Sequence, residues 1–300
     1  MTEQAFVPFE RLVVAGVGLM GGSLALAAKQ RGLAKHVVAC SRRLETANAA
    51  LAMGLVDEVS NDLSEALVNA DALFLAAPVA QFTALLGTVA AAQSEHLLVF
   101  DAGSTKANIV DIALQLGRNA SGVAAPWLAN FVPCHPIAGA EKHGPGAALA
   151  TLYEGRTLVL CPHADNSERS VARVRHFWQA MGMRVTEMDA QEHDRLFAAV
   201  SHLPHWLAYA YVHSLLRTST GEIDMKEGGA GFRDFSRIAG SSAEMWVDIF
   251  QENQAQLLAH LDAFQASLDQ LRQSLTSGQR GELLNELGRV CDSRKNWTGR

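Results

Sequence analysis

Short apolar runs alternate with alanine-rich stretches from residue 11 to about residue 190. The runs are rich in Val, Leu and Phe, which is typical of strands buried on both faces. The alanine-rich stretches between them have the length of helices. The alternation therefore predicts an α/β domain with a mostly parallel sheet and helices on both of its faces. The expected strands span residues 11–16, 36–41, 72–78, 97–103, 131–136, 157–162 and 183–188.

The pattern changes after Asp189, where strand signals stop and long helical patterns begin. We therefore expect an α/β domain over residues 1–189 and an all-α domain over residues 190–300. Within the second domain, apolar positions step alternately by four and three, which is typical of a helix that packs on another helix. The core of an intramolecular bundle and a dimer interface explain this seam equally well. Its positions are Phe250, Gln254, Leu257, Leu261, Phe264, Leu268, Leu271 and Leu275.

The composition favours a small molecule as the partner. The chain has 300 residues, is 49% hydrophobic and carries a formal net charge of −6 without any basic run, so we expect no nucleic-acid or membrane surface. It has neither a signal-peptide pattern nor an apolar run of transmembrane length, so we expect a cytoplasmic protein. The four cysteines lie far apart without a C-x-x-C pair, which predicts neither a disulfide framework nor a zinc site.

A glycine motif, Gly16-x-Gly18-x-x-Gly21, follows the first expected strand and opens an alanine-rich helix. This is the context in which G-x-G-x-x-G binds the pyrophosphate of a dinucleotide, so the α/β domain is expected to be of the Rossmann type. The helix start favours the anion through its unpaired N–H groups. The residues expected to bind the cofactor here are Gly16, Gly18, Leu19, Met20 and Gly21, with Ala77 and Pro78 after the strand at 72–78.

The second expected strand ends in Ser41, Arg42 and Arg43, where an NAD-binding site usually has an acidic residue for the ribose. A hydroxyl and two guanidiniums suit a 2′-phosphate, so NADP is favoured as the cofactor. NAD stays open, because exposed arginines at a strand end are often only solvated surface.

Two side chains at strand ends are candidates for catalysis. Ser104 follows the strand that ends at Asp101, and His135 lies at the end of the next, so both are expected at the edge where open parallel sheets bind ligands. A neutral imidazole suits proton abstraction near neutral pH. Ser104 either orients it or caps a helix. No metal is expected, because the adjacent Cys134 and His135 would point to opposite faces of a strand.

The helical domain supplies possible substrate contacts. The stretch VSHLPHWLA places His202 and His205 at a helix start, where polar residues are common. The glycine-rich stretch 226–237 contains Arg233 and Arg237, whose guanidiniums suit a carboxylated substrate. The residues alone therefore indicate a dinucleotide-dependent oxidoreductase with an anionic substrate.

Five motifs, in this order, resemble the prephenate/arogenate (cyclohexadienyl) dehydrogenase family of tyrosine biosynthesis. They are VGLMGGSLALA, DAGSTK, HPIAGAEKHGP, VSHLPHWLA and GFRDFSRIAGSSAEMWVDIFQEN, and they span roughly residues 11–255. The resemblance implies oxidative decarboxylation of prephenate, arogenate or both, with hydride transfer to NAD(P)+, giving 4-hydroxyphenylpyruvate or tyrosine. It also implies a homodimer.

The resemblance further implies roles for individual residues. His135 would accept the proton of the substrate 4-hydroxyl, Ser104 would hydrogen-bond both that imidazole and the substrate, and Arg237 would bind the ring carboxylate. The other residues that it places near the substrate are His205, Arg233, Ala140, Glu141 and Trp246, the last reaching the neighbouring subunit's site.

Several points stay open at this level. Ala140 stands where Thr is common in the family, which leaves the preference between prephenate and arogenate undecided. Because the chain ends at Arg300, tyrosine acting as a feedback inhibitor is expected to bind at the active site itself. The alternatives are another NAD(P)-dependent oxidoreductase with a helical second domain, and a non-catalytic NADP-binding sensor. A base with an ordinary imidazole pKa would make kcat/KM rise between about pH 5.5 and 8.

Overall fold

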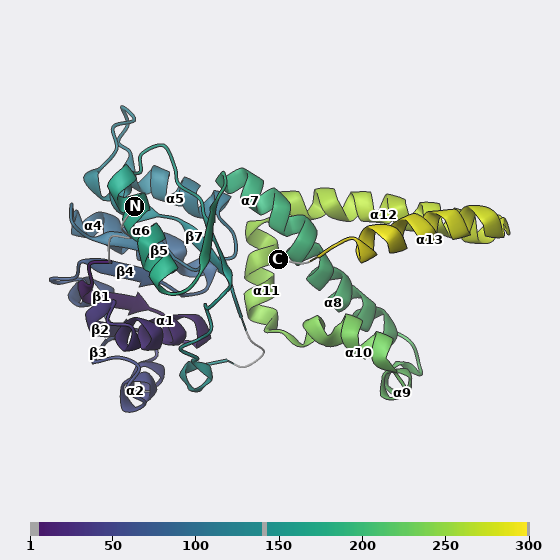
Figure 1. Ribbon diagram of the computed structural model, residues 1–300, viewed down its shortest axis with the longest axis horizontal. Helices are drawn as coiled ribbons and strands as arrows, with labels where there is room; N and C mark the ends of the chain where they lie inside the picture. The colour runs from purple at the N-terminus through teal and green to yellow at the C-terminus, as the bar shows by residue number, and fades with distance from the viewer. Residues whose placement is uncertain (1–5, 140–142, 299–300) are drawn as a thin grey trace.

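The α/β domain and the helical domain lie side by side, and a helical hairpin projects from the second domain away from the first (Figure 1). The structure is a computed structural model, and it describes residues 6–139 and 143–298. Within these residues, no helix is both long and apolar enough to cross a membrane.

The main sheet of the first domain has six strands, and all of its neighbouring pairs are parallel. The order β3-β2-β1-β4-β5-β6 is that of the doubly wound dinucleotide-binding folds. The fold class expected from the sequence is thus confirmed. The strands are β1 (Phe9–Ala15), β2 (Ala34–Cys40), β3 (Glu58–Ser60), β4 (Ala72–Leu75), β5 (Leu98–Asp101) and β6 (Phe131–Val132).

Helices pack on both faces of this sheet. They are α1 (Leu19–Gln30), α2 (Leu44–Ala52), α3 (Leu63–Ala66), α4 (Phe82–Ala92), α5 (Ala107–Gly117) and α6 (Glu168–Ala180), with the 3-10 turns η1 (Val79–Gln81), η2 (Pro126–Asn130) and η3 (Pro145–Ala147). Alternate strand residues enter two separate cores. Leu12 and Val14 pack in one with α1 and α6, and Val13 and Ala15 pack in the other with α4 and α5.

A second sheet of three strands, β7 (Cys134–Ile137), β8 (Thr157–Leu160) and β9 (Arg184–Glu187), was not expected. The sequence pattern predicted one strand over 131–136 in the main sheet. Pro133 divides it instead: β6 ends the parallel sheet, and β7 pairs antiparallel with β8. Proline has no N–H to donate to a sheet ladder, so a strand is readily interrupted there. His135 consequently lies on β7.

The second set of elements is helical, as expected, and begins where Asp189 caps α7 by accepting hydrogen bonds from Gln191 and Glu192. The elements are α7 (Ala190–Phe197), the π-helical turn η4 (Ala198–His202), α8 (Leu203–Leu216), α9 (Gly221–Lys226), α10 (Ala230–Ser236), the 3-10 turn η5 (Arg237–Gly240), α11 (Ala243–Glu252), α12 (Gln254–Thr276) and α13 (Arg280–Lys295).

The heptad-like seam is divided between two helices, and only its inner part is buried within one protomer. Asn253 separates α11 from α12, so Phe250 belongs to the earlier helix. Of the seam positions on α12, Leu257 is buried, but Leu268 and Leu275 are 51% and 68% exposed even though α12 and α13 run side by side as the projecting hairpin (Figure 1). The outer half of the seam therefore remains uncovered within one protomer.

One buried ion pair fixes the junction between the sheets. The Lys106 ammonium lies 2.5 Å from Oδ2 of Asp101, and both side chains are fully buried. Asp101 also accepts hydrogen bonds from the backbone N–H groups of Gly103 and Cys134, each at 2.8 Å. These bonds join the end of β5, the start of α5 and the strand that carries His135.

We expect Lys106→Met to lower the free energy of unfolding by about 3–5 kcal/mol, because it leaves the Asp101 charge buried without its cation. Urea denaturation measures the change. Lys29→Met, at the partly exposed pair with Asp57, is the matched control and should cost at most about 1 kcal/mol. Equal losses in the two variants would contradict a special role for the buried pair.

Candidate active site at the domain junction

The glycine turn after β1 is shaped for a close approach to the helix start. Gly16 has φ +98°, and a Cβ there would lie 2.6 Å from the carbonyl oxygen of Ala76. A Cβ on Gly21 would lie 1.9 Å from the carbonyl oxygen of Gly16, so α1 packs on the turn only without a side chain. A Cβ on Gly18, in contrast, would meet nothing within 4 Å. The turn is tight on its protein side and open on its outer side.

Helix α1 begins at this open side without a side-chain cap on Gly18, so its first N–H groups are available to an anion. Leu19 and Met20 form its first turn and are partly exposed. On the other side of the turn, Ala77 is partly exposed and Pro78 is exposed after β4. The residues present therefore fit the pyrophosphate of a dinucleotide.

The end of β2 lies next to the turn, because the N–H of Gly16 donates to the carbonyl of Cys40. Ser41, Arg42 and Arg43 follow directly. Both arginines are exposed, and neither guanidinium forms an ion pair within the part of the chain that the structure describes. A phosphate bound at this end of the turn would therefore lie near the two guanidiniums of Arg42 and Arg43.

His135 on β7 is partly buried, and its Nδ1 lies 2.9 Å from Nε2 of His193 at the start of the helical domain. Both imidazoles pack against the ring of Phe197, with centroid distances of 5.0 and 4.5 Å. Burial lowers the pKa of His135 well below its ordinary value, and the neighbouring His193 and Lys106 act in the same direction. His135 is therefore a neutral imidazole near neutral pH.

Cys134 is turned away from this cluster. Its Sγ donates to the carbonyl of Asp101 at 2.9 Å, and burial raises the pKa of the thiol far above its usual value. A protonated, buried thiol is a poor metal ligand. Among the residues that the structure describes, no group of three or more His, Cys, Asp or Glu side chains is arranged to hold a metal ion.

Two further histidines come from the start of the helical domain. The π-helical turn η4 places His202 in the interior, where burial lowers its pKa to about 4. The ring of His205 stacks on Trp246 of α11, with 3.6 Å between ring centroids and 22° between planes. Burial also lowers the pKa of His205, and the Arg237 charge adds to this effect. Trp246 thus packs beside a candidate substrate residue of its own protomer. Its expected reach into the neighbouring subunit's site stays a prediction.

The remaining expected site residues that the structure describes lie in the helical domain or just before α5. Arg233 on α10 and Arg237 at the start of η5 are exposed. Ser104 is partly exposed just before α5, and no hydrogen bond between it and His135 is among the contacts of the described residues. Since Nδ1 of that imidazole lies against His193, the role of Ser104 in orienting His135 stays a prediction. Ala140 and Glu141 lie outside the described residues.

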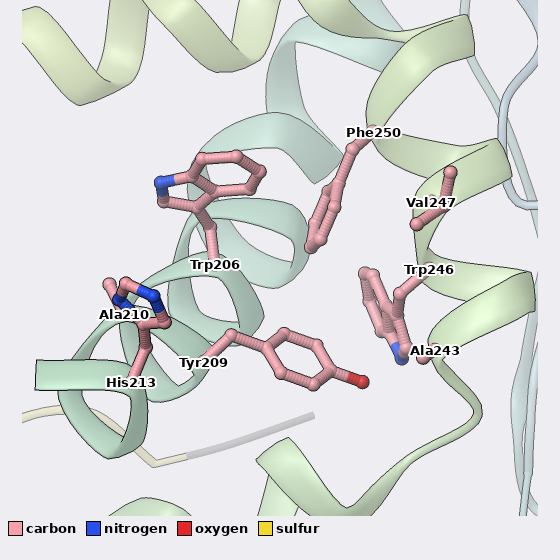
Figure 2. Close-up of a pocket in the computed structure, with 8 residues that line it drawn as sticks. All are labelled: Trp206, Tyr209, Ala210, His213, Ala243, Trp246, Val247 and Phe250. Atoms are coloured by element: carbon pink, nitrogen blue, oxygen red, sulfur yellow. The ribbon is translucent and has the colours of Figure 1, made fainter. Parts of the chain in front are cut away.

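An apolar cavity of about 430 Å³ lies between α8 and α11. Figure 2 shows the rings of Trp206, Tyr209, Trp246 and Phe250 around it. Trp246 borders this cavity and also stacks on His205. The remaining walls are His213, Ala210, Ala243 and Val247. The cavity is distinct in chemistry from the polar cluster around His135.

Sequence reasoning missed His193 and Asp194. The Nδ1 of His193 lies 2.7 Å from Oδ1 of Asp194, and both residues are buried. Their only local signal was a histidine and an aspartate inside a short amphipathic helix, AQEHDRLF, which is also the signal of an ordinary solvated helix face. Nothing in the sequence showed that this helix faces β7, since His135 and His193 are 58 residues apart.

A doubly wound sheet, an open glycine turn and a neutral histidine at the adjoining junction define the class of an NAD(P)-dependent dehydrogenase. Comparisons with known proteins agree. The family described as prephenate dehydrogenase, nucleotide-binding domain matches residues 24–187, and that described as prephenate dehydrogenase, dimerization domain matches residues 189–289. The chain belongs to the prephenate dehydrogenase family.

Individual relatives span nearly the whole chain. A cyclohexadienyl dehydrogenase of Zymomonas mobilis is 32% identical over 281 residues, covering 93% of this chain and 92% of the relative. The structure of Aquifex aeolicus prephenate dehydrogenase in complex with hydroxyphenyl propionate and NAD+ is 31% identical, with a TM-score of 0.88 and coverage of 96% and 98%. Synechocystis arogenate dehydrogenase is 29% identical, with a TM-score of 0.78 and coverage of 95% and 99%.

The buried position of His135 changes the pH dependence expected from the sequence alone. Because its pKa lies below the ordinary 6.5, the base stays unprotonated at pH 6.5. We expect kcat/KM of the dehydrogenase reaction to remain on its plateau down to pH 6.5 and to fall only at lower pH, as His135 gains a proton. A pH series of initial rates measures this, and an acid limb centred at pH 6.5 or above would contradict it.

Proposed function

We propose that this chain catalyses the NADP-dependent oxidative decarboxylation of prephenate, arogenate or both in tyrosine biosynthesis. The observation that carries the proposal is the neutral His135 at the domain junction, in a chain that also has an open glycine turn and belongs to the prephenate dehydrogenase family. The product is 4-hydroxyphenylpyruvate from prephenate and tyrosine from arogenate. The bound hydroxyphenyl propionate in the Aquifex aeolicus relative belongs to the same chemical class as these products.

In this reaction His135 accepts the proton of the substrate 4-hydroxyl. Bound NADP supplies the acceptor for the hydrogen that leaves the same carbon as hydride. The bond to the ring carboxylate then breaks, CO₂ departs, and its electron pair completes the aromatic ring. His135 suits the first step, because a neutral, partly buried imidazole accepts a proton without first losing one to solvent.

Charged and polar side chains of the helical domain serve substrate binding in this proposal. Arg237, whose charge acts on the adjacent His205, binds the ring carboxylate, and Arg233 adds positive charge. A tight grip on the anion would resist its conversion to CO₂, so Arg237 contributes to binding more than to the chemical step. Ser104 donates to the substrate hydroxyl. The stacked pair of His205 and Trp246 borders the substrate in this proposal. On the resemblance alone, Ala140 and Glu141 are also proposed to contact the substrate.

NADP is the proposed cofactor because of the cationic end of β2. The exposed guanidiniums of Arg42 and Arg43 and the hydroxyl of Ser41 suit a 2′-phosphate, and residues 41–44 directly after β2 include no carboxylate to hold a ribose hydroxyl.

A homodimer through the helical domain is also proposed. Support comes from the exposed apolar side chains of the hairpin, such as Leu268 and Leu275, from the apolar cavity between α8 and α11, and from the match to a dimerization domain over residues 189–289. Sedimentation equilibrium tests it, because a particle of one 32.2 kDa chain at micromolar concentration would overturn the dimer. Tyrosine, as the product or its close analogue, is proposed to inhibit by occupying the active site.

We expect His135→Asn to lower kcat by about two to four orders of magnitude with little change in KM, as for loss of a general base. Arg237→Gln should instead chiefly raise KM. The appearance of reduced nicotinamide with prephenate and with arogenate measures both. The exposed His143 provides the matched control, because His143→Asn should leave the rate unchanged. Cofactor binding by the unaltered protein without turnover of either substrate would favour a non-catalytic sensor.

The double variant Arg42→Ala/Arg43→Ala should lower kcat/KM for NADP by about tenfold or more, since charge-assisted hydrogen bonds to the phosphate are lost, and should leave NAD nearly unaffected. Arg184→Ala, at an exposed arginine on β9, is the control. A clear preference of the unaltered protein for NAD would overturn the assignment.

A further inference from the structure

A chain of two hydrogen bonds runs from the candidate base into the helical domain. Nδ1 of His135 lies 2.9 Å from Nε2 of His193, and Nδ1 of His193 lies 2.7 Å from Oδ1 of Asp194. His193 is fully buried and Asp194 is 2% exposed. The proposed function uses only the first member of this chain.

The carboxylate at the far end is held by the N-terminus of α5. Oδ1 of Asp194 accepts the backbone N–H of Lys106 at 2.8 Å, and Oδ2 accepts that of Ala107 at 2.9 Å. The backbone carbonyl of Asp194 accepts a hydrogen bond from the side-chain amide of Asn253 at 2.8 Å. A helix N-terminus favours a negative charge, so both the position and the charge of the carboxylate are set by elements outside α7.

This arrangement determines which nitrogen of each ring carries the proton. A carboxylate oxygen can only accept, so Nδ1 of His193 is the donor to Asp194. In a neutral His193 the other nitrogen, Nε2, then has a lone pair and accepts from Nδ1–H of His135. A neutral His135 is consequently left with a lone pair on Nε2, and this is the nitrogen available to a substrate hydroxyl.

The proposed reaction needs a base that keeps the proton. The hydroxyl proton moves to His135, hydride goes to the nicotinamide, and the electron pair of the broken C–CO₂ bond enters the ring and leaves a phenolate oxygen. That oxygen takes the proton back, so the balanced reaction releases CO₂ and reduced cofactor and no proton. Between these two transfers the protein holds one extra positive charge in a largely buried site.

We propose that His193 and Asp194 are the positioning residues of this base: they fix His135 in the tautomer with a free Nε2, and they hold the extra proton until the phenolate takes it back. When Nε2 of His135 accepts the substrate proton, the Nδ1 proton passes to Nε2 of His193, which becomes an imidazolium hydrogen-bonded to Asp194. The reverse transfers return the proton. This inference rests on the proposed function for its chemical step.

The surroundings agree with this assignment. The groups that face the two rings are Lys106 and Asp101 from the α5 and β5 side and His202 from η4. The Lys106 ammonium is already paired with Asp101 at 2.5 Å. Burial lowers the pKa of both rings, so they are neutral before substrate binds and the extra charge appears only during turnover.

Asp194→Asn separates this role from a merely structural one. Oδ1 faces both Nδ1 of His193 and the N–H of Lys106, so the amide oxygen takes this position and the tautomers are kept, but the negative charge that stabilises an imidazolium at His193 is lost. We expect kcat to fall by about tenfold or more with KM within about threefold, because the proton held on His193 loses its counter-charge. Asp189→Asn, at the cap of the same helix and without an imidazole contact, is the matched control and should retain kcat.

A spectroscopic measurement gives a second readout that needs no activity. In ¹⁵N-histidine-labelled holoenzyme at pH 7.5, His135 should have a protonated Nδ1 and an unprotonated Nε2, and Asp194→Asn should leave both signals in place while it lowers kcat. His193→Gln, whose amide oxygen still accepts from His135, should keep the tautomer of His135 but lower kcat by about tenfold or more, because it stores no proton.

The outcomes distinguish this inference from the proposed function. A folded Asp194→Asn protein with unchanged kcat, or an unaltered protein whose His135 carries its proton on Nε2, would overturn the role of His193 and Asp194 alone. If the unaltered protein oxidises neither prephenate nor arogenate, the proposed function fails, and the tautomer measurement still decides whether the hydrogen-bonded chain orients His135. Should Asp194→Asn not fold, the tautomer and rate of His193→Gln decide.

Discussion

The carboxylate of Asp101 is the point on which the geometry of the site depends. It ends a central strand of the parallel sheet, and its hydrogen bonds and ion pair fix the turn into α5, the lysine at the start of that helix and the first residue of β7. The backbone of Lys106 in turn binds Asp194 of the helical domain. A single buried anion thus sets the relative positions of the parallel sheet, the histidine strand and the first helix of the second domain.

The parts of the fold that follow from local periodicity were predictable. The apolar runs at β1, β2, β4 and β5 and the glycine turn after β1 identify a doubly wound sheet, because burial on both faces and the need for a tight turn leave a direct trace in the residue types. Strand β3 is only Glu58–Ser60, too short and too polar to give such a trace. The division of the expected strand 131–136 was not predicted, although the missing N–H of Pro133 explains it, and the pairing of β7 with β8 depends on contacts that no local pattern encodes.

In the candidate site, too, the residues with a local sequence signal were predictable and the contacts between distant segments were not. His135, the glycine turn and the arginines after β2 follow from their places at strand ends. The partner of His135 did not follow, because the contact joins two domains and is made by a residue whose local sequence resembles any amphipathic helix start. Ser104 was expected to orient His135. Among the described residues no hydrogen bond joins the two, and Nδ1 of the imidazole faces His193 instead. The uncovered apolar face of α12 shows the same dependence on partners outside the local pattern.

The capping of α5 by Asp194 has a consequence for how the molecule moves. The first turn of a helix in one domain obtains its hydrogen-bond acceptor from the other domain, so a hinge that separated the domains at this point would leave buried N–H groups unsatisfied. The two domains are therefore held together at this side of the junction. A dinucleotide that binds at the open side of the glycine turn, near Gly18, does not require this capping contact to break.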